Sequence, residues 1–289
     1  MSLNKLHPLS LFIFFAAIII ITVISQTPFV LIISFVFALT AQCFYNTKSK
    51  AKTLIHDLLL FLIISLINPI FSHNGKTILF FLNDNPITLE AFLYGANSAL
   101  MIVAVICWCS VYSKLMGADK TIYLTQKIMP KTGIVLALAV GFVPKLKQKY
   151  VTLREIAVTT GKYDESLLGK CRLHLALFSA LITRSLEDSI ITADSMRARR
   201  FGDCSKIYST YRFKTADFIM IFICAAAVVS YIAAVFFGIA ETRFYPEFIM
   251  PCPNLSDIIM YVFLAALGAL PIIFEFTEKI RWKFYSLKI

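Results

Sequence analysis

Residues 193–202 read Ala193-Asp-Ser-Met-Arg-Ala-Arg-Arg-Phe-Gly202 and end a predicted helix near the close of a basic stretch, residues 141–214. Long apolar segments flank this stretch on both sides. The stretch itself lacks an apolar run of the ~20 residues that a helix needs to cross a bilayer. We interpret it as a cytoplasmic docking device that is carried by a membrane domain.

The composition indicates a polytopic membrane protein. Of the 289 residues, 58% are hydrophobic and only 16% are charged, whereas soluble globular chains average about 45–50% apolar and about 25% charged residues. A chain this apolar could not cover its surface in water. The net charge of +11 is explained by Lys and Arg on cytoplasmic loops, so we expect no nucleic-acid partner and the lipid bilayer as the surroundings.

Six apolar runs have about the length of a membrane-spanning helix. We predict spans at residues 9–25, 28–45, 53–70, 89–112, 216–239 and 258–274. With this topology, all but two of the 28 Lys and Arg residues lie on one side of the membrane, the exceptions being Lys76 and Arg243. The positive-inside rule then places both termini and the coupling region in the cytoplasm of a multi-pass cell-membrane protein.

The predicted fold class is all-α, a polytopic membrane protein with about six transmembrane helices plus a cytoplasmic domain of long amphipathic coupling helices. N-terminal spans occupy residues 1–131, the coupling helices residues 132–214, and C-terminal spans residues 215–289. The apolar run 133–143 is too short to cross, so we expect it to pack under the membrane domain or to re-enter slightly. Turn formers dominate residues 71–86, which predicts a loop.

The first amphipathic helix of the central stretch is expected to begin near Pro144, because proline suits a helix start. Gly161 is a suitable stop. One face of this helix carries apolar side chains that recur at spacings of 3 or 4 residues: Leu146, Tyr150, Leu153 and Ala157.

The second amphipathic helix is expected over residues 165–201, before Gly202. At ~1.5 Å per residue it would be about 55 Å long, which suits a lever. Its apolar face carries side chains 3 or 4 residues apart: Leu175, Phe178, Ile182, Leu186, Ile190, Ala193 and Met196. Two roles fit this face, namely packing on a membrane partner or under the spans, and packing against the first helix.

Three arginines crowd the last turns of the second helix: Arg197, Arg199 and Arg200. Cations there complement the negative helix end, which is worth roughly 0.3–1 kcal/mol. They also suit anionic headgroups, at about 1 kcal/mol each. A third interpretation is docking, in which the small Ala198 lets the tip enter a groove while Arg199 meets a partner carboxylate. Residue chemistry alone leaves these three interpretations open.

The sequence contains no catalytic or metal-binding constellation. Its seven Cys and four His are scattered, without a CxxC motif or a second His at helical spacing. The carboxylates of the central stretch form no pair beside a Lys or Arg phosphate clamp: Asp164, Glu165, Glu187, Asp188, Asp194 and Asp203. We therefore expect a non-catalytic chain with no metal and no cofactor of its own.

Two alternatives belong to other classes. A membrane-embedded enzyme acting on lipid-linked substrates would need clustered carboxylates or a His near the bilayer surface. A self-contained secondary transporter should have repeat symmetry and charged side chains near the membrane midplane. An alanine scan of the carboxylates, with activity measured in the absence of any ATPase, tests both.

Three sequence blocks follow one another in a fixed order. The first is Asn68-Pro-Ile-Phe71 with His73, Gly75, Thr77, Leu79 and Phe80, followed by Ile87-Thr-Leu-Glu-Ala91 and Tyr94-Gly95. The second is Phe142-Val-Pro144 leading a basic helix with Arg154-Glu155. The third is Ala193-Asp-Ser-Met196 with Ala198-Arg199 and Phe201-Gly202. Together, over about residues 68–202, they resemble the transmembrane T component of energy-coupling factor (ECF) transporters, a cobalt-transport-permease-like family.

The resemblance implies a partner set and a mechanism. In that family the T component joins two cytoplasmic ABC-type ATPases, which bind ATP and Mg, to a small membrane S component that captures a vitamin or a metal ion. Two coupling helices each end in a short Ala-Arg-Gly-like motif that sits in a groove of one ATPase. By this resemblance, Ala198-Arg199-Arg200 is the second motif and Thr159-Thr160-Gly161 occupies the place of the first.

Two positions depart from the family pattern. Arg200 stands where the family commonly has Gly, and Thr160 stands where an Arg is common. The second departure puts equal engagement of both ATPases in doubt. An asymmetric ATPase pair would accommodate it.

Overall fold

The computed structural model describes residues 6–45, 50–72, 75–82, 85–160, 166–200, 211–236, 242, 244 and 255–286. The chain divides into two compact units. Unit 1 comprises Met1–Gly117 with Tyr211–Ile289, and unit 2 is the intervening Ala118–Thr210.

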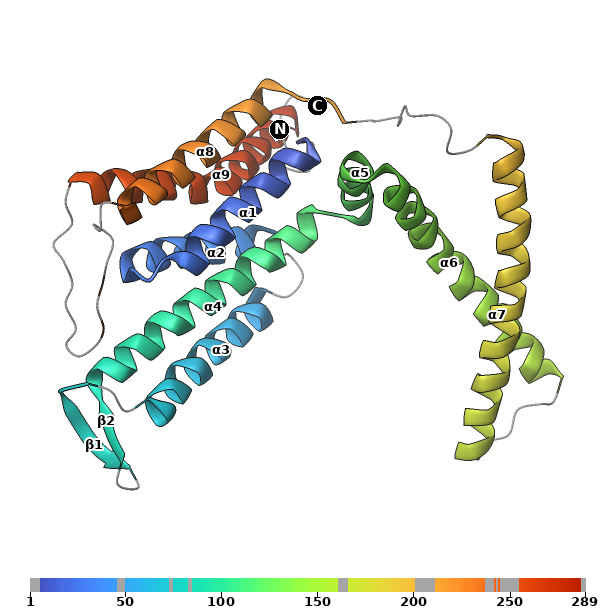
Figure 1. Ribbon diagram of the computed structural model, residues 1–289, viewed down its shortest axis with the longest axis horizontal. Coiled ribbons are helices and arrows are strands. Elements are labelled where there is room, and N and C mark those ends of the chain that lie inside the picture. Colours follow the sequence, from blue (N-terminus) through green and yellow to red (C-terminus); the bar gives the residue numbers. More distant parts are fainter. Residues whose placement is uncertain are drawn as a thin grey trace. The chain divides into compact units, whose positions relative to one another are not determined.

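Unit 1 has a helix at each of the six predicted spans (Figure 1). These are α1 (Pro8–Ile24), α2 (Pro28–Tyr45), α3 (Lys50–Phe71), α4 (Leu89–Leu115), α8 (Thr215–Phe236) and α9 (Leu255–Ser286). Prolines stand at the beginning of α1 and α2, where their missing N–H is not needed for an intrahelical bond. The side chain of Thr88 caps α4 by accepting a hydrogen bond from the Ala91 N–H at 3.3 Å.

Five of these helices are long and apolar enough to cross a membrane: α2, α3, α4, α8 and the part Asp257–Thr277 of α9. The apolar α1 has 17 residues, about 26 Å at ~1.5 Å per residue, which is short of the ~30 Å hydrocarbon layer. The described chain therefore fits an all-α membrane protein with five candidate spans, and the count of six spans stays a prediction.

Polar contacts tie the helices of unit 1 together at a buried Trp. The Trp108 Nε1–H of α4 donates to Ser34 Oγ of α2 at 3.1 Å, and Ser34 Oγ lies 2.9 Å from Thr22 Oγ1 of α1. Phe14 and Phe15 meet the Trp108 ring edge-on. Because lipid gives helices little hydrophobic reason to associate, such packing and hydrogen bonds hold them together.

The segment predicted as a loop, residues 71–86, contains part of a β-hairpin. Strand β1 (Ile78–Leu82) pairs antiparallel with β2 (Asn85–Thr88), with an irregularity in the register between Ile78 and Phe80. The loop prediction was wrong here because the run Ile-Leu-Phe-Phe-Leu has a stronger β preference than the surrounding turn formers suggest.

Unit 2 consists, among its described residues, of α5 (Ala118–Ile128), α6 (Pro130–Thr159) and α7 (Leu167–Ala198). Helices α5 and α6 pack closely, since a Cβ on Gly133 would stand 2.3 Å from Gln126 Cγ. Unit 2 therefore begins with α5, at Ala118, whereas the sequence placed the boundary at residue 132.

The predicted start of the first amphipathic helix near Pro144 was wrong. Helix α6 begins at Pro130 and continues through Pro144, so residues 133–143 are its first half and not a separate apolar segment. A proline inside a helix removes one backbone hydrogen bond and favours a kink, but it need not end a helix of 30 residues. Helix α7 lies within the predicted range 165–201 and has 32 residues.

Candidate docking surface of the α6–α7 pair

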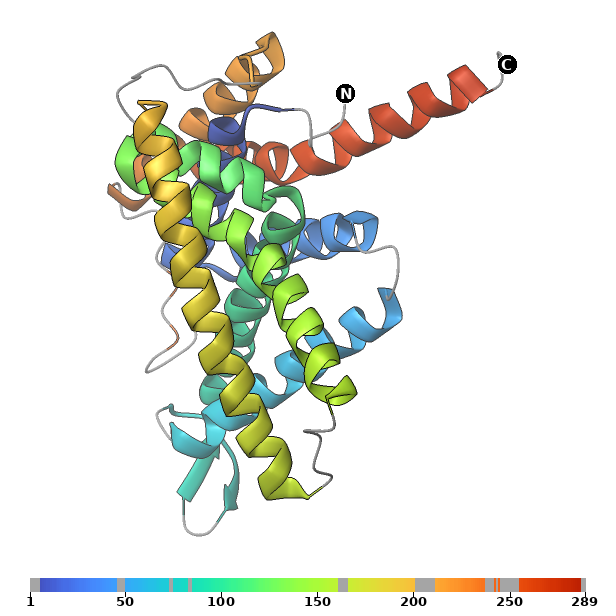
Figure 2. The ribbon, with the colours of Figure 1, turned by 90° about the vertical axis from the view of Figure 1, so that its right-hand side faces the viewer.

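Helices α6 and α7 cross one another, and α7 runs past α6 as one uninterrupted helix (Figures 1 and 2). Ser166 caps the beginning of α7 by accepting a hydrogen bond from the Gly169 N–H at 3.0 Å. Two polar contacts join the helices, an ion pair between Lys149 and Asp188 and a hydrogen bond of 2.9 Å between Tyr150 Oη and His174 Nδ1.

The apolar face predicted for α6 is turned largely inward. Ala157 is only 9% exposed, and Leu146, Tyr150 and Leu153 are half-buried. Leu146 and Leu153 line a cleft between α6 and α7, together with Ile191 of α7.

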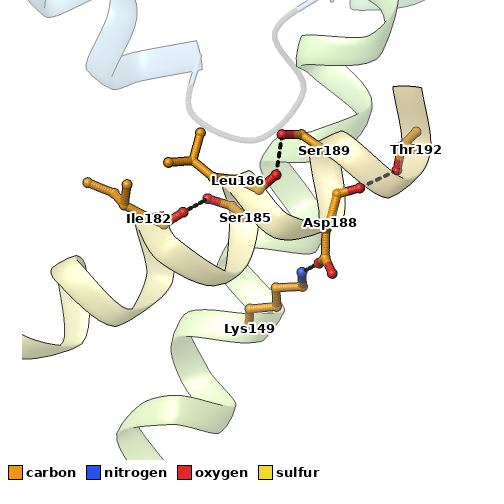
Figure 3. A network of polar contacts seen from close by, with 7 residues as sticks. All are labelled: Lys149, Ile182, Ser185, Leu186, Asp188, Ser189 and Thr192. Carbon is orange, nitrogen blue, oxygen red and sulfur yellow. Dashed lines mark hydrogen bonds and ion pairs between the residues drawn. The ribbon is translucent and has the colours of Figure 1, made fainter. Parts of the chain in front are cut away.

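Helix α7 presents a polar side to α6, as Figure 3 shows. Two hydroxyl side chains that line the cleft beside α6 donate to carbonyl groups of their own helix, Ser185 to Ile182 at 2.9 Å and Thr192 to Asp188 at 2.7 Å. Ser189 likewise donates to Leu186 O at 2.8 Å. These bonds satisfy the hydroxyl groups without a partner from another helix. The side chains of Ile182 and Leu186 point away from Lys149.

The predicted apolar face of α7 is consequently exposed along its length. We call it the apolar stripe, and its side chains are 42–66% exposed: Leu175, Phe178, Ile182, Leu186 and Ile190. In a soluble helical pair the apolar stripe normally faces the partner helix. Here Leu177, on another side of α7, is the buried leucine, at 6% exposure. Packing against α6 does not cover the apolar stripe.

The tip of α7 combines exposed cations with a left-handed residue. Arg199 is the C-cap residue, and its N–H donates to Ser195 O at 3.2 Å. Arg200 follows with φ +52° and donates its N–H to Arg197 O at 3.0 Å, which is one of the two hydrogen bonds that define a Schellman motif. Ala198, Arg199 and Arg200 are exposed, and within the described chain no carboxylate pairs with either arginine.

The backbone conformation of Arg200, with φ +52°, is one that favours glycine. A left-handed residue directly after a helix is usually Gly, because any Cβ is strained in that conformation. The presence of Arg200 at this position therefore affects the backbone strain of the helix end as well as its charge.

The tip of α6 is chemically different. Thr159 Oγ1 donates to Glu155 O and Ile156 O at 3.0 and 2.9 Å, and the Thr160 hydroxyl bonds to Ile156 O. Both hydroxyl groups therefore bond to carbonyl groups of their own helix, and Ile156 O also accepts the Thr160 N–H at 3.0 Å. Gly161, the third residue of that predicted motif, lies outside the described residues, as do Phe201 and Gly202 of the other.

A cleft of about 740 Å³ lies between α6 and α7. Its charged lining consists of Lys145, Lys149, Arg184, Glu187 and Asp188. Sequence reasoning did not bring these five together, because they come from two helices whose crossing sets their spacing. The Lys149–Asp188 ion pair occupies two of them.

In unit 1, Thr77 and Glu90 of the first sequence block are joined by hydrogen bonds that the sequence analysis did not predict. We call this contact the Thr77–Glu90 latch. The Glu90 carboxylate accepts hydrogen bonds from the Thr77 N–H at 3.2 Å and from the Thr77 hydroxyl at 2.8 Å. Gly75, with φ +141°, lies so close that a Cβ would stand 2.6 Å from Glu90 Oε2. In the sequence, Gly75-x-Thr77 precedes the hairpin and Thr88-x-Glu90 closes it, and this pattern could have indicated the contact.

Among the residues that the structure describes, no three His, Cys, Asp or Glu side chains are arranged to hold a metal ion. Comparison with known proteins adds no identification: no protein-family model and no curated protein sequence matches this chain.

Proposed function

We propose that this chain is the transmembrane coupling subunit of an ECF-type ABC importer for a vitamin or metal ion. In this proposal α1 is a sixth span, and both termini and the α6–α7 pair lie in the cytoplasm, as the distribution of Lys and Arg favours. The observation that carries the proposal is on α7, where an exposed apolar stripe and an exposed arginine tip belong to one continuous helix.

The arginine tip would be the contact with one ATPase. Arg199 has no described carboxylate partner, and guanidinium groups form their strongest hydrogen bonds with carboxylates. A groove lined by Asp or Glu on an ATPase would therefore hold it. ATP and Mg would bind to the two ATPases and not to this chain.

The apolar stripe would contact the small membrane S component. Five side chains that are 42–66% exposed would be covered by a partner with an apolar surface, at a gain of about 25 cal/mol per Å² of buried area. A helix of 32 residues, about 48 Å long at ~1.5 Å per residue, would carry movement from the arginine tip along this contact. Its one glycine, Gly169, is in the first turn.

The two tips would engage the two ATPases unequally. The α6 tip offers threonine hydroxyls that already bond to their own helix, whereas the guanidinium groups of the α7 tip have no carboxylate partner among the described residues. A heterodimeric ATPase pair, with one groove for each tip, would fit this difference.

A pull-down tests the proposal. The full chain is purified in detergent as wild type, Arg199→Glu and Arg172→Glu, and the co-purifying ATP-binding subunits are identified by mass spectrometry. Arg172 is the matched control because it is an exposed arginine of the same helix, remote from the tip. We expect loss of one ATPase with Arg199→Glu and retention of both with Arg172→Glu.

If the wild type binds no ATPase, the coupling proposal fails. The charged cleft between α6 and α7 then favours the second candidate, a membrane-embedded enzyme for lipid-linked substrates, because Lys145, Arg184 and Glu187 line the same cleft. Hydrolysis of such a substrate by the chain alone, lost in Glu187→Gln, would support that candidate.

A further inference from the structure

The β-hairpin of unit 1 presents its outer strand to the surroundings. Strand β2 lies against the ends of α3 and α4, and Ile87 and Thr88 are buried at 8% and 0% exposure. In β1, by contrast, Ile78, Leu79 and Phe81 are 51%, 55% and 67% exposed. An apolar edge strand of this kind would promote aggregation if it were left in water.

The hairpin is held firmly at its base. The Leu89 N–H donates to Thr77 O at 3.0 Å, next to the Thr77–Glu90 latch. The exposed side chains of β1 therefore have a fixed place at the beginning of α4 and do not belong to a free loop.

The hairpin lies at the ends of two candidate membrane spans, α3 and α4, whose ends also carry exposed apolar side chains. At the end of α3, Ile70 and Phe71 are 53% and 82% exposed, and at the beginning of α4, Leu89 and Phe92 are 40% and 44% exposed. Both helices have the length and composition of membrane spans, so these side chains face lipid. The hairpin that carries β1 lies at these same helix ends (Figure 1).

The backbone limits how deep β1 can lie. Its unpaired edge carries N–H and C=O groups that cannot be left without partners in the hydrocarbon layer. The exposed Lys76 next to the strand also requires water or headgroups nearby. Both features fit the boundary between headgroups and acyl chains.

We propose that β1 is a lipid anchor, whose side chains Ile78, Leu79 and Phe81 insert among phospholipid acyl chains at the membrane surface remote from Lys50 and Lys114. The anchor would fix the depth of the α3–α4 pair in the bilayer. This inference requires α3 and α4 to span the membrane but does not depend on the proposed coupling function.

Photo-crosslinking tests the anchor in the full chain. The photoreactive residue p-benzoylphenylalanine replaces Phe81 in one variant, Ile78 in a second and Phe222 in a third. Phe222 is 75% exposed on the span α8 and calibrates the yield for a lipid-facing side chain. Each variant is reconstituted alone into phosphatidylcholine–phosphatidylglycerol vesicles and irradiated, and its intact mass is measured.

We expect a mass increase of one phospholipid at position 81 or 78, with at least half of the yield found at position 222. A yield at both β1 positions below half of that at 222 would overturn the anchor and indicate a strand that awaits a protein partner. A crosslinked dimer in place of the lipid adduct would overturn it too, since β1 would then contact a second copy of the chain. Two β1 positions are tested, so that the result does not depend on one variant that fails to fold.

Discussion

Tyr150 Oη lies 2.9 Å from His174 Nδ1, and this hydrogen bond connects α6 to α7. A tyrosine hydroxyl can donate or accept, so the contact persists whichever nitrogen of the imidazole carries the proton. Together with the Lys149–Asp188 ion pair, it gives the contact between the two helices two polar links. The apolar stripe of α7 stays exposed and is available to a partner.

Tyr150→Phe should weaken the α6–α7 contact slightly. The hydrogen bond is exposed, so we expect a loss of at most about 1 kcal/mol in the free energy of unfolding. Thermal unfolding in detergent measures it, and a double-mutant cycle with His174→Ala isolates the pair. Equal effects of Tyr150→Phe in the wild type and in His174→Ala would mean that the two side chains are not coupled.

Arg200→Gly should stabilise the end of α7. The φ of +52° costs a residue with a Cβ about 1–2 kcal/mol, which glycine avoids. Arg197→Gly is the matched control, since it removes the same side chain from inside the helix and should destabilise by about 1 kcal/mol. Unfolding curves of the two variants should therefore shift in opposite directions, and a shift in the same direction would contradict the left-handed end.

Leu186→Glu should leave the purified chain as stable as the wild type, because Leu186 is 59% exposed. It should nevertheless abolish co-purification of a membrane partner that covers the apolar stripe. Leu177→Glu is the contrasting variant, since a carboxylate at a site that is 6% exposed should destabilise the chain by several kcal/mol, about 2–5. A large loss of stability in Leu186→Glu would show that the apolar stripe is covered by the chain itself.

Gly75→Ala should disrupt the base of the β-hairpin. The new Cβ would collide with Glu90 Oε2 and Thr88 Oγ1 at 2.6 and 2.8 Å, and the φ of +141° adds strain of about 1–3 kcal/mol. Gly141→Ala is the control, because nothing lies within 4 Å of its Cβ position in α6 and alanine favours a helix by about 1 kcal/mol. We expect the first variant to lower the unfolding temperature and the second to raise it or leave it unchanged.

The positions of the long helices could be predicted from the sequence because each is a local property. Apolar runs of about 20 residues have few alternatives to a helix, and α2 has the bounds that were predicted, Pro28–Tyr45. Prolines predicted the beginnings of helices less reliably. Pro28 begins a helix, whereas Pro144 lies inside one, since the residues before it also favour a helix.

Which side of α7 faces α6 could not be predicted in the same way. Periodicity identified the apolar stripe as one side of the helix, but burial depends on which surface approaches it. Ser185, Asp188 and Thr192 line the cleft beside α6, and the stripe remains exposed. The left-handed Arg200 and the Thr160 hydroxyl, bonded to its own helix, likewise depend on the backbone at each helix end.

By itself the sequence determined the class of the chain, the place of its apolar helices and the existence of two long amphipathic helices between them, because composition and spacing act over a few turns. Only the tertiary structure decided that the Gly75–Thr77 segment meets Glu90, that the apolar strand β1 lies at the ends of α3 and α4, and that the stripe on α7 is uncovered. Those outcomes depend on contacts between residues distant in the chain, which no local pattern specifies.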